Sequence, residues 1–566
     1  MRRDNPNQAP KIGVFVCECG AKIGDVVNIP EVVENAKKLP NISFVERDIS
    51  LCSSAGVKHV KEAISKNDVD RVVFAACSIK NYGSLLENAC ENAGINKYLI
   101  SFANIREQCA WAHYEDPKGA TRKAINVVGM AVARVQESEP LKDLELEVEP
   151  STLIIGGGVS GMTAALCLAN QGFRVFLVEK EPELGGMLNK LYKLYLTNQN
   201  VSEVLSPIIE RVRSHRNIKL FTSASLKEVE GHFGDFEITI SAKGGTEKFR
   251  VGTIILATGA EVFEPSGMYG YGGHEGIITQ LELEQILKQG KLKQPGKVVM
   301  IQCVGARGEE GVSYCSRICC MVAVKNATLI KQLYPECEVY IIYRDLQTYG
   351  KENEEYHAKA RELGIRFVEY TPENRPEIIS NGNGKLKVKI YHALLGETLN
   401  IDSDLVVLST PLIQHMGGEE ISKMFKIPLG SDGFFREAYM EMQSVTLGVN
   451  GIYVCGAAQG PKSIDESVTQ AYAAASQAAS PMFLKRVKIS AITAEVDEEL
   501  CIGCQLCMDV CPFHAVIFEE GKPIIIEAVC RGCGNCAAGC PSKAISMKGF
   551  KDEQILAEVQ AAFKNG

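Results

Sequence analysis

Two runs of cysteines near the C-terminus constrain this chain more than any other feature of its sequence. The first, CIGCQLCMDVCP, covers residues 501–512, and the second, CRGCGNCAAGCP, covers residues 530–541. Each has the spacing C-x2-C-x2-C-x3-C-P, in which three thiolates of a run bind one [4Fe-4S] cluster and the fourth binds the other. The spacing therefore predicts two clusters, with these ligand sets: Cys501, Cys504, Cys507 and Cys540 for the first, and Cys530, Cys533, Cys536 and Cys511 for the second.

A pair of zinc ribbons is the competing interpretation of these cysteines, because zinc sites also use closely spaced cysteine pairs. The proline after each fourth cysteine and the doubling of the run favour iron–sulfur clusters instead. Soft thiolate ligands also argue against a site for a hard cation. We therefore expect a protein that carries electrons.

The bulk properties exclude several other functions. A length of 566 residues predicts three or four domains of about 150 residues each. The net charge of -8 and the lack of a basic cluster argue against nucleic-acid binding. No stretch reaches the ~18 apolar residues of a membrane span, and the N-terminus has no apolar core long enough for a signal peptide. With 21 cysteines, we expect a cytoplasmic protein whose thiols bind metal or act in redox chemistry.

The chain divides into four expected segments. Residues 1–140 alternate short apolar runs with helical patterns and predict a small α/β domain with six cysteines. Residues 141–485 predict a large α/β body, residues 486–548 contain the two cysteine runs, and residues 549–566 predict a helical tail. Some of the N-terminal cysteines follow apolar runs, and ligands of such sheets collect at the carboxyl ends of the strands.

Residues 151–180 predict a strand, a glycine turn, a helix and a second strand. Gly156, Gly158 and Gly161 form G-x-G-x-x-G, in which the glycines make the turn, admit the pyrophosphate and let the helix approach the strand. The N-terminus of the helix then binds the phosphates. Glu179 ends the second strand, where it can bind a ribose hydroxyl. The complete unit predicts a dinucleotide site rather than a simple turn.

The residues that follow favour FAD over NAD. A double glycine follows the second strand, an Ala-Thr-Gly run ends a later strand, and a late glycine run begins near residue 456. This order resembles the flavoproteins with two dinucleotide-binding domains, such as thioredoxin reductase, in which the first domain holds FAD. The resemblance implies these further cofactor contacts: Lys180, Gly185, Gly186, Thr258, Gly259, Gly456 and Gln459. Those enzymes usually have Gly-Asp where this chain has Gly456-Ala457, so their acidic contact to the phosphoribityl part of FAD is missing.

A second dinucleotide fold is expected to begin near residue 297, but it lacks the glycine fingerprint. Cys303, Val304 and Gly305 stand where the fingerprint would be. A tight NAD(P)H site is therefore not expected, and we expect electrons to enter from a protein partner.

Several longer runs together resemble one family, the A subunits of heterodisulfide reductase. They are IQCVGAR (301–307), YCSRICCMVAVKNA (314–327), ANIREQCAW (103–111), VFAACS (73–78), ITQLELE (278–284) and GIYVCGAAQGPKSIDESVTQAYAAA (451–475). The resemblance covers essentially the whole chain. It implies a thioredoxin-reductase-like α/β flavoprotein core between an N-terminal α/β iron–sulfur domain and a C-terminal 2[4Fe-4S] ferredoxin domain.

The resemblance also implies a function. The protein would pass electrons from a donor partner through FAD and [4Fe-4S] clusters to a disulfide-reducing partner, with flavin-based bifurcation toward a low-potential acceptor. The implied partners are heterodisulfide-reductase B/C-like subunits and a donor such as hydrogenase, formate dehydrogenase or a linker protein, in a homodimer within a larger complex. The long form of the family carries an inserted ferredoxin module. Here residues 232–259 continue from strand to strand without a cysteine, so a partner supplies that branch or this relative does not bifurcate by itself.

The resemblance further implies a third [4Fe-4S] cluster in the N-terminal domain. Five cysteines there match the motif positions of the family, and Cys90 does not; the five are Cys17, Cys19, Cys52, Cys77 and Cys109. Which four of them bind the cluster is open at this point. Buried packing thiols are the alternative.

Two further groups are candidates for redox chemistry. Cys315 and Cys319 lie four residues apart in an expected helix and would share a face, with Cys320 and Cys303 nearby. They are open to three interpretations: a redox dithiol, metal ligands, or packing thiols. Lys325 matches a lysine near the flavin in the family, where a cation would stabilise the reduced flavin; the alternative is a surface lysine.

Two other functions stay open from the sequence alone. One is the electron-input component of another low-potential reductase, such as an aromatic-ring reductase complex. The other is a self-contained NAD(P)H-dependent reductase, which the missing second fingerprint disfavours.

Overall fold

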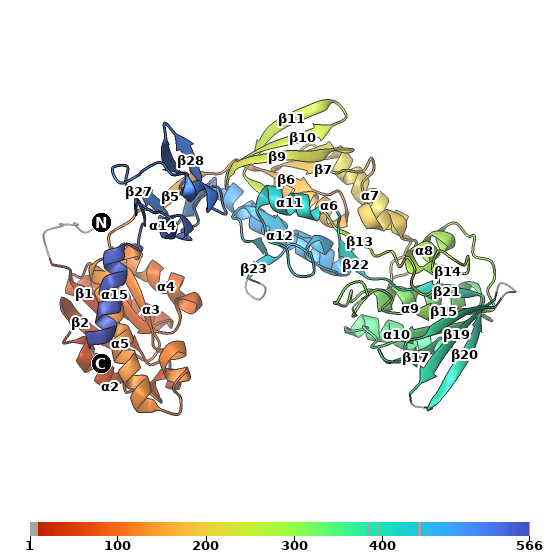
Figure 1. Ribbon diagram of the computed structural model, residues 1–566, viewed down its shortest axis with the longest axis horizontal. Coiled ribbons are helices and arrows are strands. Elements are labelled where there is room, and N and C mark those ends of the chain that lie inside the picture. Colours follow the sequence, from red (N-terminus) through yellow and green to blue (C-terminus); the bar gives the residue numbers. More distant parts are fainter. Residues whose placement is uncertain (1–8, 309, 382–384, 394, 440–442, 565–566) are drawn as a thin grey trace. The chain divides into compact units, whose positions relative to one another are not determined.

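The computed structural model describes residues 9–308, 310–381, 385–393, 395–439 and 443–564 (Figure 1). The chain forms two compact units. The first contains residues 1–145 and 488–566, and the second contains residues 146–487. The N-terminal domain and the C-terminal cysteine runs therefore belong to one unit, although more than 300 residues of sequence separate them.

The N-terminal part of the first unit is a parallel sheet in the order β2-β1-β3-β4. Its strands are β1 (Ile12–Cys17), β2 (Ile42–Asp48), β3 (Arg71–Ala76) and β4 (Ile100–Asn104). Helices cover it: α1 (Ala21–Gly24), α2 (Ile29–Ala36), α3 (Ser54–Asn67), α4 (Ile79–Asn92) and α5 (Pro117–Gln136). The apolar runs of β1 and β3 are buried, as strands of a covered parallel sheet require.

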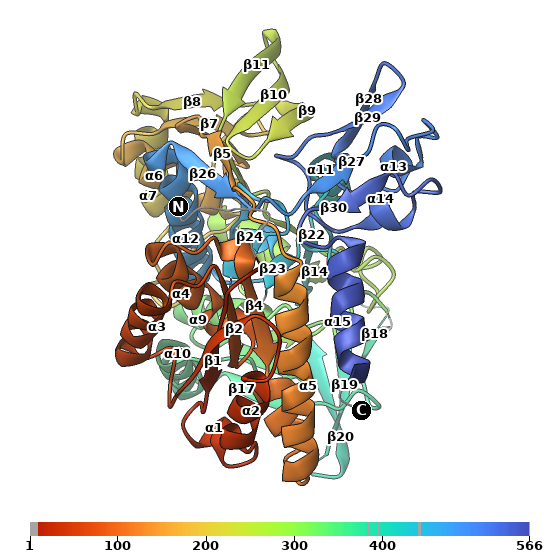
Figure 2. The same cartoon turned by 90° about the vertical axis from the view of Figure 1, so that its left-hand side faces the viewer.

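The C-terminal part of the first unit is small and repeats itself. Strand β27 (Ala494–Val496) pairs with β30 (Ile545–Met547), and β28 (Val516–Glu519) pairs with β29 (Lys522–Ile525). The short helices α13 (Leu506–Asp509) and α14 (Asn535–Ala538) occupy corresponding places in the two cysteine runs. The tail forms α15 (Asp552–Lys564), which packs along α5 (Figure 2). Arg134 of α5 pairs with Glu558 at 3.3 Å and stacks on the Phe550 ring.

The second unit contains two sheets of the dinucleotide-binding kind. The first has seven strands in the order β23-β24-β25-β12-β6-β7-β8. In that order the strands are Glu437–Tyr439, Gln443–Leu447, Ile452–Val454, Thr253–Leu256, Ser151–Ile155, Arg174–Val178 and Ile218–Phe221. Its helices are α6 (Val159–Asn170), α7 (Val201–Ser214) and α12 (Ile464–Leu484). The antiparallel strands β9 (Ser225–His232), β10 (Asp235–Ala242) and β11 (Gly245–Val251) form a separate sheet.

The second sheet is parallel, in the order β14-β21-β15-β16-β17. In that order its strands are Ile277–Thr279, Leu405–Leu408, Lys297–Ile301, Glu338–Tyr343 and Arg366–Glu369. Helices α8 (Gln280–Lys288), α9 (Cys319–Leu333) and α10 (Lys351–Glu362) pack on it. A three-stranded sheet follows, made of β18 (Glu377–Asn381), β19 (Lys385–His392) and β20 (Glu397–Ser403).

These elements confirm the expected α/β class with two dinucleotide-binding folds in one body. Within the residues that the structure describes, no helix is both long enough and apolar enough to span a membrane. The Ala-rich segment near residue 475 forms the buried face of α12, which packs against the core.

Candidate functional site

Four of the N-terminal cysteines lie together at the carboxyl edge of the four-stranded sheet. Cys17 ends β1, Cys19 follows it, and Cys52 and Cys77 follow β2 and β3. The charges of Cys19 and Cys52 act on Cys17, and that of Cys19 acts on Cys77. Burial raises the pKa of Cys17 to about 11, so a bound metal would be needed to keep it as a thiolate at neutral pH.

Cys109 lies apart from this group. It is buried in the single turn of π-helix Arg106–Trp111, its Sγ is 3.8 Å from the Asn104 carbonyl, and no other thiol of the described residues acts on it. Arg106, from the same turn, does reach the group and donates to Cys19 Sγ at 3.3 Å. The structure thus separates one of the five candidate thiols from the other four.

The second C-terminal ligand set converges in the structure. Cys511, Cys530, Cys533 and Cys536 line one cavity, although Cys511 belongs to the other run. Backbone N–H groups also point at the sulfurs: Ala515 N donates to Cys511 Sγ at 3.3 Å, and Ala494 N donates to Cys530 Sγ at 3.4 Å. Such bonds favour the thiolate form.

The first C-terminal set is built on the same plan. Cys507 is buried beside Cys501 and Cys504, and Cys540 packs in the same small core as Cys507. The loops repeat their backbone too, with positive φ at Gly503 and Gln505 in one run and at Gly532 and Gly534 in the other. In the described part of the chain, no three or more His, Cys, Asp or Glu side chains are arranged for a metal ion. A cubane is larger than one ion and needs its thiolates farther apart.

The glycine fingerprint adopts the geometry that a dinucleotide needs. Gly156 has φ 109°, and a Cβ there would lie 2.3 Å from the Ala257 carbonyl. A Cβ at Gly161 would lie 1.8 Å from the Gly156 carbonyl, so both positions require glycine. At Gly158, by contrast, no protein atom lies within 4 Å of a built Cβ. The open space lies at the N-terminus of α6, where a pyrophosphate would bind.

The neighbouring predicted residues surround this turn. Glu179 is buried, and its carboxylate accepts from Gly157 N at 2.6 Å and Glu181 N at 2.8 Å. Gly185 N donates to the Gly157 carbonyl at 2.9 Å. Gly186 lies against Gly158, because a Cβ on Gly186 would be 3.2 Å from the Cα of Gly158. Thr258 and Gly259 follow β12, at the same edge of the sheet. Lys180 turns elsewhere and contacts His415.

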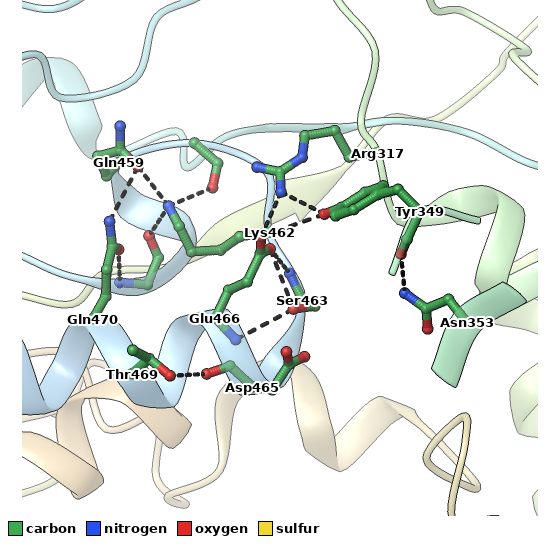
Figure 3. Close-up of polar contacts among 12 residues, drawn as sticks. Arg317, Tyr349, Asn353, Gln459, Lys462, Ser463, Asp465, Glu466, Thr469 and Gln470 are labelled. Atoms are coloured by element: carbon green, nitrogen blue, oxygen red, sulfur yellow. Dashed lines mark hydrogen bonds and ion pairs between the residues drawn. The ribbon is translucent and has the colours of Figure 1, made fainter. Parts of the chain in front are cut away.

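The late glycine run closes the same edge of the sheet. Gly456 follows β25, and a Cβ there would lie 2.1 Å from Ser160 Oγ of α6. Lys462 has a relative exposure of 8%. Its ammonium donates to the carbonyls of Gly456 at 3.0 Å and Gly460 at 3.2 Å, and to Gln459 Oε1 at 2.6 Å (Figure 3). Burial lowers the pKa of Lys462 to about 8.

A polar network joins this loop to the second dinucleotide fold. Glu466 forms a capping box with Ser463 at the start of α12, through bonds of 2.9 Å and 3.3 Å. Its other oxygen pairs with Arg317, which also donates to the Tyr349 hydroxyl at 2.5 Å (Figure 3). Arg317 N in turn donates to Cys315 Sγ at 3.3 Å. The start of α12 is therefore tied directly to a thiol of the other fold.

The second fold has thiols where a phosphate turn would be. Between β15 and α9 the chain forms a long loop, with φ 62° at Cys303. The charges of Cys303, Cys315 and Cys320 act on Cys319, which is the first residue of α9. The expectation that Cys315 and Cys319 share a helical face is wrong, because α9 begins only at Cys319. The loop, not the helix, brings the four thiols together.

Lys325 lies in α9 and is not a surface residue. Its side chain is 3% exposed and forms an ion pair with Glu284 of α8, whose side chain is fully buried. The ammonium also donates to the Lys193 carbonyl at 3.0 Å, and Glu284 accepts from Tyr192 N at 2.8 Å. The pair therefore anchors the segment that follows the double glycine. Burial lowers the pKa of Lys325, and Glu284 partly offsets the effect.

Sequence reasoning missed the partners of these groups. Glu284 lies 41 residues from Lys325; it ends the run ITQLELE, but nothing in that run indicates a contact with Lys325. Arg317 and Lys462 were not predicted as site residues either. The capping pattern Ser463-x-x-Glu466 was a readable signal for the start of α12, although it did not reveal the bond to Arg317.

Comparisons with known proteins agree with this site. Residues 150–478 match the pyridine nucleotide-disulphide oxidoreductase family, and residues 494–517 match the 4Fe-4S binding domain. The first match indicates a flavoprotein core of the thioredoxin reductase kind, and the second indicates iron–sulfur binding.

Relatives match over nearly the whole chain. The first iron–sulfur A subunit of CoB–CoM heterodisulfide reductase from Methanopyrus kandleri is 37% identical over 653 aligned residues, covering 97% of this chain and 97% of the relative. The A subunit of the H(2):CoB-CoM heterodisulfide,ferredoxin reductase of Methanothermobacter marburgensis is 36% identical, covering 98% of each. The iron–sulfur A subunit of CoB–CoM heterodisulfide reductase from Methanocaldococcus jannaschii is also 36% identical, covering 98% of this chain and 99% of the relative. The chain thus belongs to the family of heterodisulfide reductase A subunits, which are iron–sulfur flavoprotein oxidoreductases.

Proposed function

We propose that this chain is the electron-transferring component of a heterodisulfide-reductase-like complex, with one FAD and several [4Fe-4S] clusters. The observation that carries the proposal is the combination, on one chain, of an open dinucleotide cradle at Gly158 and separate groups of converging thiols. FAD exchanges electron pairs and single electrons, and each cluster carries one electron at a time. The protein supplies the places that hold these carriers.

The geometry supports specific ligands in the N-terminal and C-terminal regions. In the N-terminal domain we assign the cluster to the four thiols that lie together, and Cys109 to the core. In the C-terminal domain we keep the two crossed sets, since Cys511 lines the cavity of the other run. The N-terminal ligands are then Cys17, Cys19, Cys52 and Cys77.

The thiol loop of the second fold supports a fourth cluster. Its four thiols act on one another electrostatically, and they gather at the N-terminus of α9, where the helix dipole favours negative charge. A dithiol would need only two of them. We therefore assign Cys303, Cys315, Cys319 and Cys320 as ligands. They would take the place of an NAD(P)H site in this fold, and we keep Lys325, which is paired with Glu284, as a proposed neighbour of the flavin.

The partners follow from the names of the relatives, which refer to CoB–CoM heterodisulfide, H(2) and ferredoxin. We propose a donor protein of the hydrogenase, formate dehydrogenase or linker type, and B/C-like subunits as the disulfide-reducing acceptor, in a complex built on a homodimer. The C-terminal cluster domain is the proposed exit to the acceptor.

Anaerobic purification of the full chain with its partners tests the proposal. We expect one FAD and about sixteen iron atoms, four per cluster. The flavin should be reduced rapidly with the donor protein present and slowly by NADH alone, because the second fold lacks a glycine phosphate turn. Fast bleaching of the flavin by micromolar NADH in stopped flow would instead establish a self-contained reductase.

A further inference from the structure

A buried ammonium group lies at the end of β25 without an anionic partner. All three acceptors of Lys462 Nζ are neutral, namely two backbone carbonyls and one amide oxygen. Among the residues that the structure describes, no carboxylate forms an ion pair with it. An unpaired charge away from water is costly, so its retention here needs an explanation.

The charged and titratable groups that face Lys462 are otherwise engaged. Glu466 uses one oxygen for the capping box and the other for Arg317, and Glu437 accepts from Val445 N at 2.7 Å. Burial raises the pKa of the Cys455 thiol to about 12, so this neighbour is uncharged. Among the described residues, the Lys462 ammonium is therefore bonded to neutral acceptors alone, while the nearby carboxylates of Glu437 and Glu466 bond other groups.

The order of the strands places this charge on the flavin side of the cofactor. The dinucleotide lies along the carboxyl ends of neighbouring strands, here in the order β25-β12-β6-β7. Glu179, at the ribose position, follows β7, and the pyrophosphate turn follows β6. The other half of the cofactor must then extend over β12 and β25. Lys462 bonds the Gly456 carbonyl at the end of β25, which is the flavin end.

We propose that Lys462 is a positioning residue that supplies the positive charge stabilising the reduced flavin. The inference rests on FAD binding as proposed above. Two electrons and one proton convert the neutral oxidised ring into a reduced ring with one negative charge, and a nearby cation favours the charged product. The pyrophosphate carries its charge in both redox states, so a cation beside it alone would leave the potential unchanged.

Spectroelectrochemical titration of the holoprotein tests this role, with dithionite as the reductant. We expect Lys462→Met to lower the equilibrium constant for flavin reduction at least tenfold, which is about 30 mV toward negative potential for a two-electron couple. Lys462→Arg, which keeps the positive charge, should shift the flavin potential far less. Lys227→Met, at an exposed lysine of β9 in the same unit, should leave it unchanged.

Sulfite affinity provides a second readout, because sulfite adds to oxidised flavin and leaves a negative charge on the ring. Lys462→Met should bind sulfite at least tenfold more weakly. Bound flavin with an unchanged potential and unchanged sulfite affinity in this variant would overturn the inference. If Lys462→Met does not hold FAD, the same titration is done on Lys462→Gln. A flavin potential equal to that of the wild type in Lys462→Gln would also overturn the inference. Wild-type protein without flavin would overturn the proposed function as well.

Discussion

Breaking the buried Lys325–Glu284 pair should cost the flavoprotein unit much of its stability. In Glu284→Gln the amide oxygen can still accept from Tyr192 N, but the amide N–H groups cannot accept from the ammonium of Lys325. Removal of one partner of a buried pair costs about 3–5 kcal/mol. Loss of the lysine's proton sets an upper limit on this cost. For a lysine with an ordinary pKa of about 10.4, deprotonation at pH 7 costs about 4.6 kcal/mol. We therefore expect the free energy of unfolding to fall by about 3–4.5 kcal/mol.

A double-mutant cycle separates the pair from its surroundings. Lys325→Met should also cost about 3–5 kcal/mol, because it leaves Glu284 buried without its cation. The variant with both changes loses only hydrogen bonds worth about 1 kcal/mol each, so it should be more stable than either single variant. Urea unfolding, followed by far-UV circular dichroism and flavin fluorescence, gives the four free energies. Glu247→Gln is the matched control, since its pair with Lys219 is 47% and 45% exposed and should contribute less than about 1 kcal/mol.

The pH dependence of this effect has a definite sign. Because burial lowers the pKa of Lys325, the folded state binds fewer protons than the unfolded state between the lowered pKa and about 10.4. The free energy of unfolding then rises with pH through that window. It should rise more steeply in Glu284→Gln, where the pKa of Lys325 is lowered further. A Glu284→Gln protein within 1 kcal/mol of the wild type at pH 7, or strictly additive effects in the cycle, would refute this account of the pair.

Three other predictions concern the cofactor sites. Gly158→Val should fold but lose FAD, since the space there is open in the protein and would receive the cofactor, whereas Gly161→Val should melt at a lower temperature because its side chain meets backbone; flavin-to-protein ratios and thermal melting separate the two. Cys504→Ala and Cys533→Ala should each stop outward electron transfer while the donor still reduces the flavin, and loss of flavin reduction with partner turnover intact would reverse the direction of flow. The difference in flavin potential between the wild type and Lys462→Met should shrink above pH 8, where the ammonium loses its proton, and a constant difference up to pH 9.5 would contradict this.

The sequence predicted those features that depend on short spacings. The glycine turn, the order of strands and helix around it and the α/β class follow from local patterns, and the structure confirms them. The crossed C-terminal ligands also came from spacing alone, because the repeat of the two runs implies a pseudo-symmetric fold. The structure brings Cys511 to the cavity of the other run, which supports the crossing.

Features that depend on tertiary contacts were beyond the sequence. The local sequence does not distinguish Cys109, which turns into the core, from Cys77, which faces Cys19. Both cysteines follow apolar strands. The burial of Lys325 depends on Glu284 from another helix, and the helical periodicity around Cys315 suggested a helix that in fact begins four residues later. For Lys325, a contact between distant segments thus decides what the local pattern leaves open.

Under the proposed assignment, the loop between β15 and α9 would let a dinucleotide-binding fold take part in electron transfer without a nucleotide. Within the described residues, no capping side chain bonds to the first turn of α9, and in the other fold the equivalent end of α6 faces the phosphate site. A helix N-terminus stabilises a thiolate by the same dipole that stabilises a phosphate. In the same loop, Gly305 packs closely against Phe263, where a Cβ would lie 2.4 Å from the ring. Under the assignment proposed above, thiolates would take the place of a phosphate at this helix end, and Arg317 connects the loop to helix α12 through Glu466.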